Sequence, residues 1–260
     1  METPDLLTSY RTVGLKRVQR HGTDVVPLER ERTSVAMVSF FPAVVMKQFY
    51  RDSENEFEKE KRILSNIATL GADHCFCKGV PIPELAIAME RWAGDLGMFI
   101  GVTSEVQNVL SALLTTLIAT VGKGFLYTDL KPENVLWRRK PSGGLETALC
   151  DYSGCAMVGD EWSCQTFPWP GSHRGGFYDK KHYDRTIQPP TEATVVWGFG
   201  VTWLILLGYE GLAYEYLSFQ HLTQRGLRAF RRLKLPLPPG LSRILNQETT
   251  ALHDIDLGLS

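Results

Sequence analysis

The segment GFLYTDLKPENVLW, Gly124–Trp137, interrupts an apolar stretch with four charged or amide side chains. They are Asp129, Lys131, Glu133 and Asn134, and apolar residues resume directly after them. A loop held between a helix and a strand explains this alternation, because both ends of such a loop are buried. The segment is therefore predicted to be a loop, and the kinds of polar residue in it suit a catalytic loop.

The spacing D-x-K-x-x-N suits phosphoryl transfer when a second acid lies nearby. Asp151, in DYSG, follows the next predicted strand. If the two strands pair as a hairpin, Asp151 converges with Asp129, Lys131 and Asn134. We assign Asp129 to accept the proton of a hydroxyl group and Lys131 to neutralise a γ-phosphate. Asn134 and Asp151 are the expected ligands of Mg²⁺.

Length and composition are those of an ordinary globular protein. The chain has 260 residues, of which 43% are hydrophobic and 22% charged, with a net charge of −1. No overall field attracts nucleic acid or an anionic membrane, so neither partner is expected. The local exception is the basic run Arg225–Lys234. We interpret it as the solvated face of a helix over Leu222–Lys234, with a site for an acidic partner or nucleic acid as the alternatives.

Neither a secretory signal nor a membrane span is predicted. The first residues lack a basic and then apolar layout. The longest uncharged run, Ala193–Tyr209, is shorter than the ~20 residues that cross a bilayer, so it is expected to be a buried helix. The five cysteines are odd in number and show no C-x-x-C spacing, which indicates reduced thiols. An intracellular protein of the cytoplasm or nucleus is expected.

The sequence pattern predicts strands in the first third of the chain and mostly helices in the remainder. Strands are predicted at Thr12–Val18, Ser34–Phe40, Ala43–Phe49, Cys75–Val80, Leu85–Arg91, Val135–Trp137 and Thr147–Cys150. Helices are predicted at Phe57–Leu70, ended by Gly71, and at Ser104–Val121, capped by Ser104. Ile244–Ser260 reads as a short helix and a loose tail. This order predicts an α+β fold of two lobes, residues 1–92 and 93–260.

Several motifs together resemble the protein kinase family. YTDLKPENVLW is similar to its His-Arg-Asp-Leu-Lys-x-x-Asn catalytic loop, and DYS stands where Asp-Phe-Gly would. AVVMK, Ala43–Lys47, resembles the strand that carries the ATP lysine, and Glu60 stands for its helix partner. VVWGFG, Val195–Gly200, resembles the start of the core helix. The Tyr-Thr-Asp form is similar to kinases of large DNA viruses.

The resemblance implies a bilobal kinase-like fold, with a small β-rich N-terminal lobe that contains one helix and a larger helical C-terminal lobe. It implies that Lys47, oriented by Glu60, bridges the α- and β-phosphates of ATP. The other residues implied for ATP binding are Val45, Met89, Glu90 and Leu136. Lys131 and Pro132-Glu133 resemble the Ser/Thr-directed form, which implies a protein substrate.

The sequence also departs from the family pattern. No G-x-G-x-x-G lies between the first two predicted strands, so the backbone cradle for phosphates is absent or built differently. Val45 stands where the family has Ala, which predicts a tighter nucleotide pocket. Thr128 replaces the arginine before the catalytic Asp, and Val195 replaces an acid that steadies the catalytic loop. These departures bear on ATP affinity and regulation.

Thr128 lacks the charge that anchors a phosphate on the loop after Asp151. We therefore expect activity without phosphorylation of that loop, whose candidate acceptors are Ser163, Thr166, Ser172 and Thr186. Packing of its aromatic residues, Phe167, Trp169, Phe177 and Tyr178, is expected to hold the loop instead.

Three interpretations of function follow. The first is an active Ser/Thr protein kinase that uses ATP and Mg²⁺. The second is a pseudokinase, a scaffolding module with weak nucleotide binding, which the missing glycines suggest. The third is a small-molecule kinase of related fold, against which Lys131 argues, because such enzymes tend to have His there. Oligomeric state and the particular substrate have no signal in the sequence.

Overall fold

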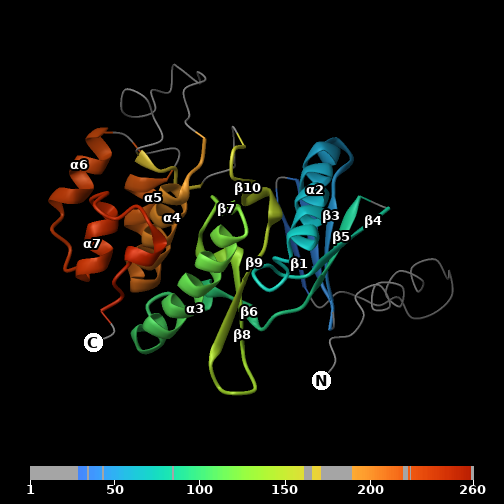
Figure 1. Ribbon diagram of the computed structural model, residues 1–260, viewed down its shortest axis with the longest axis horizontal. Helices are drawn as coiled ribbons and strands as arrows, with labels where there is room; N and C mark the ends of the chain where they lie inside the picture. The colour runs from blue at the N-terminus through green and yellow to red at the C-terminus, as the bar shows by residue number, and fades with distance from the viewer. Residues whose placement is uncertain are drawn as a thin grey trace. The chain divides into compact units, whose positions relative to one another are not determined.

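The computed structural model describes residues 29–33, 35–42, 44–83, 85–160, 166–170, 189–218, 222 and 224–258. The chain divides into two compact units, Met1–Trp92 (unit 1) and Ala93–Ser260 (unit 2). The predicted α+β class is confirmed, because an antiparallel sheet in unit 1 precedes a mostly helical unit 2 (Figure 1).

Unit 1 contains a five-stranded antiparallel sheet in the order β1-β2-β3-β5-β4. Its strands are β1 (Glu29–Arg32), β2 (Ala36–Phe40), β3 (Val44–Phe49), β4 (Gly79–Ile82) and β5 (Ala86–Glu90). The predictions for β2, β3 and β5 are confirmed to within two residues. The predicted strand Thr12–Val18 lies outside the described residues. β1 was missed, because its sequence ERER has no apolar alternation.

The strand predicted at Cys75–Val80 was placed too early in the sequence. The extended segment is Gly79–Ile82, which includes Pro81, whereas Cys75 lies in a turn where its N–H donates to Ala72. Proline is tolerated here because β4 is the last strand of the sheet, where ladder hydrogen bonds are needed on one side only. Cys75 and Cys77 are both buried free thiols.

One helix, α2 (Glu54–Leu70), lies against the sheet of unit 1 (Figure 1). A short 3₁₀ turn, η1 (Arg51–Ser53), leads into it, so the helix begins three residues earlier than predicted. It ends at Gly71 as predicted, because φ there is 61°, a conformation that glycine adopts without strain. Its buried side chains are Phe57, Glu60, Ile63, Leu64 and Ile67.

The described part of unit 2 is built from helices and two small sheets. The helices are α3 (Thr103–Gly122), α4 (Glu192–Leu204), α5 (Glu210–Leu217), α6 (Gln224–Arg232) and α7 (Pro239–Leu245), with short turns η2 (Leu96–Phe99), η3 (Pro132–Asn134), η4 (Tyr152–Gly154) and η7 (Leu252–Asp254). The sheets are β6-β8-β9 and β10-β7, formed by β6 (Gly94–Asp95), β7 (Phe125–Tyr127), β8 (Val135–Arg139), β9 (Leu145–Leu149) and β10 (Cys155–Met157).

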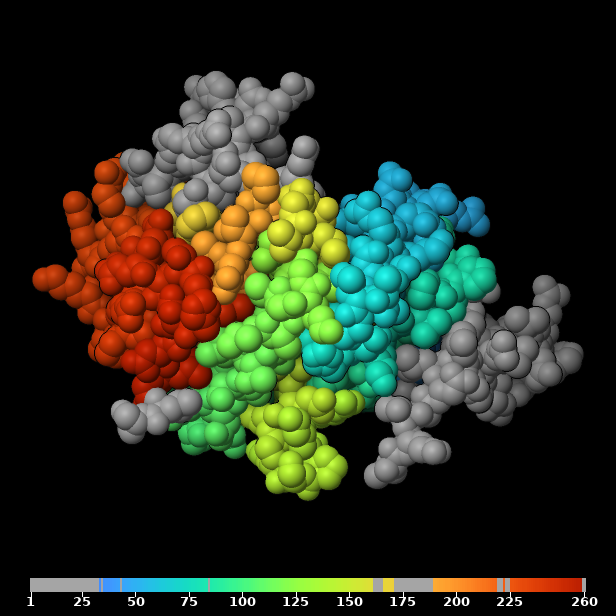
Figure 2. Space-filling view, in the orientation of Figure 1, coloured from blue at the N-terminus to red at the C-terminus, as the bar shows by residue number. Residues whose placement is uncertain are grey.

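Strands β8 and β9 form the hairpin that the sequence predicts. They pair in antiparallel register from Val135 opposite Leu149 to Arg139 opposite Leu145. Asp129 precedes β8 and Asp151 follows β9, so both belong to the end of the hairpin away from its turn. The exposed turn itself protrudes from unit 2 (yellow-green in Figure 2).

Ser104 is not the cap of α3. The helix begins at Thr103, and its N-cap position, Val102, makes no side-chain hydrogen bond. The chain turns at Gly101, where φ is 77°, and the Glu105 N–H already donates to the Val102 carbonyl. Ser104 therefore lies inside the first helical turn.

The predicted buried helix is confirmed as α4, in which every residue from Ala193 to Leu204 is buried. It continues through a π-helical turn, η6 (Ile205–Tyr209), where Gly208 has a φ of 90°. By length and composition alone, Thr103–Gly122 and Glu192–Leu217 could each cross a membrane, a test that buried core helices also pass.

The last residues of unit 2 are packed more closely than a loose tail. Leu252 and Leu257 are buried, and the Leu252 N–H donates to Glu192 Oε1 at 2.7 Å. α7 begins at Pro239, five residues before the predicted helix, since a proline suits the first turn of a helix. Gly240 in that turn lies directly against the Asp256 carbonyl.

Gly240→Ala tests this packing. A Cβ at Gly240 would lie 1.8 Å from the Asp256 oxygen, a backbone atom that cannot move without shifting the tail. We expect a loss of about 1–3 kcal/mol in the free energy of unfolding, measured by urea titration. Gly144→Ala is the matched control, because a Cβ there meets nothing within 4 Å. Equal stability of the two variants would contradict the proposed contact.

Candidate active site

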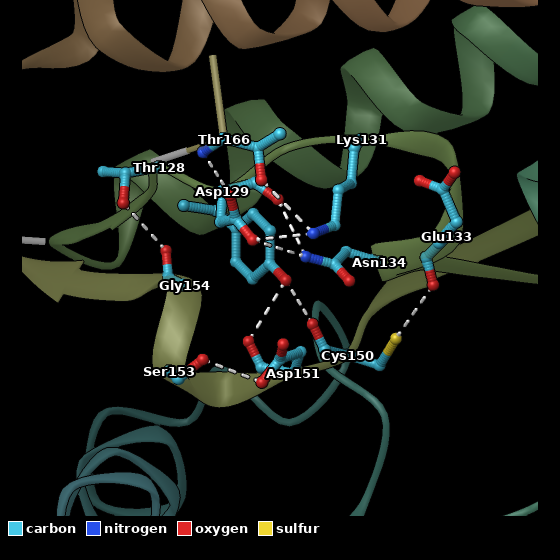
Figure 3. Close-up of polar contacts among 11 residues, drawn as sticks. Thr128, Asp129, Lys131, Glu133, Asn134, Cys150, Asp151, Ser153, Gly154 and Thr166 are labelled. Atoms are coloured by element: carbon cyan, nitrogen blue, oxygen red, sulfur yellow. Dashed lines mark hydrogen bonds and ion pairs between the residues drawn. The ribbon is translucent and has the colours of Figure 1, made fainter. Parts of the chain in front are cut away.

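The Asp129 carboxylate is the centre of a buried polar cluster in unit 2 (Figure 3). Oδ1 accepts the backbone N–H of Thr166 at 2.5 Å. Oδ2 accepts Asn134 Nδ2 at 3.1 Å and lies 3.2 Å from Lys131 Nζ. Three of the predicted site residues, Asp129, Lys131 and Asn134, are therefore in direct contact.

The spacing D-x-K-x-x-N works because η3 folds the chain back. Pro132 begins this short turn, and the Asn134 N–H donates to the Lys131 carbonyl at 3.0 Å. The Asn134 side chain thereby reaches both the Asp129 carboxylate and the Asp129 carbonyl, the latter at 2.9 Å. The Asn134 carbonyl accepts the Cys150 N–H, which ties the loop to the end of β9.

Lys131 is held as a cation. Its Nζ lies between Asp129 Oδ2 and Thr166 Oγ1, at 3.2 and 3.3 Å. Burial lowers the pKa of Lys131, but the charge and hydrogen bond of Asp129, aided by Asp151 and Tyr214, outweigh burial and raise it. The ammonium group therefore stays protonated throughout the neutral range.

Asp151 lies at the end of β9 in a strained backbone conformation. Its φ is 58° and its ψ 79°, a left-handed region that costs a residue other than glycine roughly 1–3 kcal/mol. Ser153 Oγ donates to Asp151 Oδ1 at 2.8 Å. Such strain is concentrated at functional sites, and here it turns the chain sharply directly after the strand.

Tyr127 joins the Asp129 loop to Asp151. Its hydroxyl donates to the carbonyls of Cys150 and Asp151, the latter at 3.2 Å. Burial, followed by the charges of Cys150, Asp151 and Asp129, raises the pKa of Tyr127 well above its ordinary value. The phenol therefore remains a hydrogen-bond donor, and it fixes the strained backbone at Asp151.

Thr128 and Gly154 link the Asp129 loop to the segment that follows Asp151. The N–H and the hydroxyl of Thr128 both donate to the Gly154 carbonyl, at 2.8 and 3.0 Å. A Cβ on Gly154 would lie 2.7 Å from Asp129 Cβ. The glycine of DYSG is thus required by close approach to Asp129, a role that the sequence alone did not reveal.

Thr166 was not predicted to belong to the site. Its N–H donates to the Asp129 carboxylate, and its Oγ1 accepts a hydrogen bond from Lys131. The next residue, Phe167, is buried, and the centroid of its ring lies 5.1 Å from that of the Tyr214 ring. Packing of Phe167, one of the aromatic residues named for this role, therefore holds this part of the loop. Phe177, Tyr178, Ser163, Ser172 and Thr186 lie outside the described residues.

Unit 1 contains the expected ion pair. Lys47 Nζ on β3 lies 2.6 Å from Glu60 Oε1 on α2, and the two side chains are 8% and 0% exposed. Removing one partner of such a pair leaves an uncompensated buried charge, which costs about 3–5 kcal/mol. The pair is therefore an integral part of the packing between α2 and the sheet.

The remaining predicted residues fall in both units. Val45 on β3 is paired with Met89 on β5, and Glu90 Oε1 accepts the Lys78 N–H at 3.2 Å, so these residues adjoin Lys47 in one sheet. Leu136 belongs to unit 2, where it lies on β8 opposite Asp95.

The turn between β1 and β2 has no glycine. Thr33 Oγ1 accepts the N–H groups of Val35 and Ala36, at 3.3 and 3.0 Å. The Thr33 N–H donates to the Ala36 carbonyl at 2.9 Å. The N–H groups of Val35 and Ala36, which are among the described residues of this turn, are thus already used by a side chain and not offered to a phosphate.

Asn134 and Asp151 fit a magnesium ion by their chemistry. Because Asn134 Nδ2 is turned toward Asp129, its amide oxygen remains as a ligand, and Asp151 supplies carboxylate oxygens. Mg²⁺ takes oxygen ligands and usually binds one or two carboxylates together with water and phosphate. No group of three His, Cys, Asp or Glu side chains that could hold a metal occurs within the described residues.

The chain matches no protein-family model and none of the curated proteins with which it was compared.

Asp129→Asn tests the electrostatics of the cluster. An amide offers one acceptor oxygen where the carboxylate serves three donors, so we expect a loss of about 1–3 kcal/mol in stability. The pKa of Lys131, followed by NMR of its ε-methylene group, should fall, because burial then acts without the opposing charge. A lysine whose pKa is raised in the folded state stabilises the fold at pH values below the ordinary lysine pKa. The difference in stability between wild type and Asp129→Asn should therefore shrink above about pH 10.4.

Asp73→Asn is the control for this experiment, because Asp73 is exposed. It should leave both the stability and the Lys131 pKa unchanged. A Lys131 pKa that is equal in wild type and Asp129→Asn would contradict the assignment of Asp129 as its partner.

Proposed function

We propose that this protein is a Ser/Thr protein kinase, which transfers the γ-phosphate of ATP to hydroxyl groups of a protein substrate. The observation that carries the proposal is the buried cluster in which Lys131 and Asn134 both contact the Asp129 carboxylate. A solvated loop has no reason to bury an acid and an amide and to hold a half-buried lysine against the acid. Phosphoryl transfer needs these three groups side by side.

In the proposed reaction Asp129 accepts the proton of the attacking hydroxyl. The hydroxyl oxygen forms a bond to the γ-phosphorus, and the bond between this phosphorus and the bridging oxygen breaks, so that ADP leaves. The Thr166 N–H and Asn134 Nδ2 fix the orientation of the carboxylate. Preorganised geometry of this kind is the main contribution a protein makes to phosphoryl transfer.

Lys131 is proposed to stabilise negative charge on the γ-phosphate. Its raised pKa keeps it cationic, and the Thr166 hydroxyl fixes its position. Asn134 and Asp151 would hold Mg²⁺, which supplies charge neutralisation of the phosphates when bound. The Tyr127 hydroxyl supports this function by holding the backbone of Asp151.

Lys47 is proposed to contact the α- and β-phosphates of ATP. A lysine on the third strand of a sheet, paired with a glutamate on the following helix, is the arrangement that protein kinases use. Glu60 is completely buried, so it orients the ammonium group and does not itself meet solvent.

A nucleotide-binding module without catalysis is the second candidate. The observation that favours it is the turn between β1 and β2, where Thr33 occupies the N–H groups of Val35 and Ala36. The phosphates of ATP would lose the backbone hydrogen bonds that a glycine-rich loop supplies. Weak ATP binding therefore accompanies either candidate.

Transfer of radiolabel from ATP to a mixed protein substrate distinguishes these candidates. Asp129→Asn and Asp151→Asn should each lower the rate by at least ~10²-fold, the scale for losing a general base or a metal ligand. Lys47→Met should abolish transfer, and the exposed control Asp73→Asn should keep the wild-type rate. Near-wild-type transfer by Asp129→Asn would overturn the assignment.

If wild type transfers no label, calorimetry with ATP and Mg²⁺ identifies the second candidate. Label that appears only on small molecules would instead indicate a small-molecule kinase.

Activity should not depend on phosphorylation of the loop after Asp151. Thr128, at the position of the family's phosphate-binding arginine, is 2% exposed and donates twice to Gly154. It offers no charge to a phosphate, whose anchoring requires charge-assisted hydrogen bonds. Protein made in bacteria and treated with phosphatase should keep its initial rate within about twofold of untreated protein, whereas ordering of a loop by phosphate is a much larger effect. A rate more than about tenfold lower after treatment would reveal a phosphorylation switch.

A further inference from the structure

Helix α6 separates its apolar and basic residues onto opposite sides. Leu227 and Phe230 are buried, whereas Arg225, Arg228 and Arg232 are exposed. With 3.6 residues per turn, these three arginines (the arginine row) lie within an arc of about 60° opposite the buried side. The fourth arginine, Arg231, points elsewhere and donates to the Leu245 carbonyl of α7 at 3.1 Å.

The stretch of sequence that contains α6 lacks acidic residues. Residues 216–247 contain no Asp or Glu, although the whole chain has 29 of them against 28 Lys and Arg. The cations of this stretch are Arg225, Arg228, Arg231, Arg232, Lys234 and Arg243. The arginine row makes no ion pair with a described residue. Like charges three and four residues apart destabilise a helix, and nothing in the described part of the chain compensates for this repulsion.

We infer that the arginine row is a docking surface for an acidic segment of a partner protein. The row extends over eight residues, from Arg225 to Arg232, which is about 10.5 Å along the helix axis. An extended chain rises about 3.4 Å per residue, so a run of about four acidic residues matches this length. Arginine suits such a partner, because its guanidinium group binds carboxylates through paired hydrogen bonds.

Nucleic acid is a poorer match for this surface. Specific or tight binding to nucleic acid commonly involves about six to ten phosphate contacts, and single strands also need exposed aromatic rings for stacking. The row offers three cations, and the aromatic residue of α6, Phe230, is buried. The docking inference is independent of the proposed phosphoryl transfer, since binding is measured directly.

The test is fluorescence anisotropy of a labelled peptide that carries eight alternating Asp and Glu residues, titrated with the full chain. Wild type should bind it about tenfold more tightly than a matched Asn/Gln peptide, the scale for a few exposed ion pairs. The preference should diminish as salt is raised from about 0.05 to about 0.5 M. R225E/R228E/R232E should abolish it. Thermal melting checks that this variant folds, and R225Q/R228Q/R232Q replaces it if the reversed charges prevent folding.

R51E/R62E/K140E is the matched control, because it makes the same change in net charge at three exposed cations outside α6. It should retain the preference within about twofold, since scattered surface charges each contribute little. Equal binding of both peptides by wild type, or equal loss in the control variant, would overturn the inference.

Tighter binding of a labelled DNA or RNA octamer through the same arginines would assign the surface to nucleic acid and overturn the inference. A shift from dimer to monomer in R225E/R228E/R232E, measured by sedimentation, would show that the occupant is a second copy and overturn it as well.

Discussion

The burial of the Asp129 carboxylate is the interaction on which the centre of unit 2 depends. A buried carboxylate without donors is expensive, so the chain around it is arranged to supply them. Lys131 and Asn134 come from the same loop, and Thr166 comes from a segment more than thirty residues later. Residue 154 is a glycine because Asp129 Cβ occupies the space that a side chain would need. The acid thus determines the path of three segments of the chain.

Local patterns predicted the elements of the fold and the residues of one loop. Runs rich in Val and Phe identified β2 and β3, helical periodicity identified α2, and a long uncharged run identified α4. The motif D-x-K-x-x-N identified Asp129, Lys131 and Asn134, because residues so close in sequence converge whenever a short turn folds between them. The pair of Lys47 and Glu60 followed from a strand and a helix that are adjacent in the chain.

Features that depend on contacts outside their own segment were missed. Thr166 carries no local sign of its contact with Asp129, since that contact arises from the packing of Phe167 against Tyr214. β1 consists of charged residues and forms because β2 offers it an edge. Proline within β4 misled the strand prediction, because only the sheet order shows that β4 lies at an edge. The deciding neighbour of Thr166 is remote in sequence, whereas β1 depends on pairing with the next strand along the chain.

The complete burial of the Lys47–Glu60 pair restricts how these two positions can change over time. Loss of either charge alone leaves the other stranded in an apolar layer, at a cost of about 3–5 kcal/mol, a large fraction of the stability of an ordinary domain. Replacement of both by well-packed apolar residues carries no such penalty. Descendants of this chain should therefore keep both residues or lose both, and a lineage without the proposed phosphate binding would be recognised by their joint disappearance.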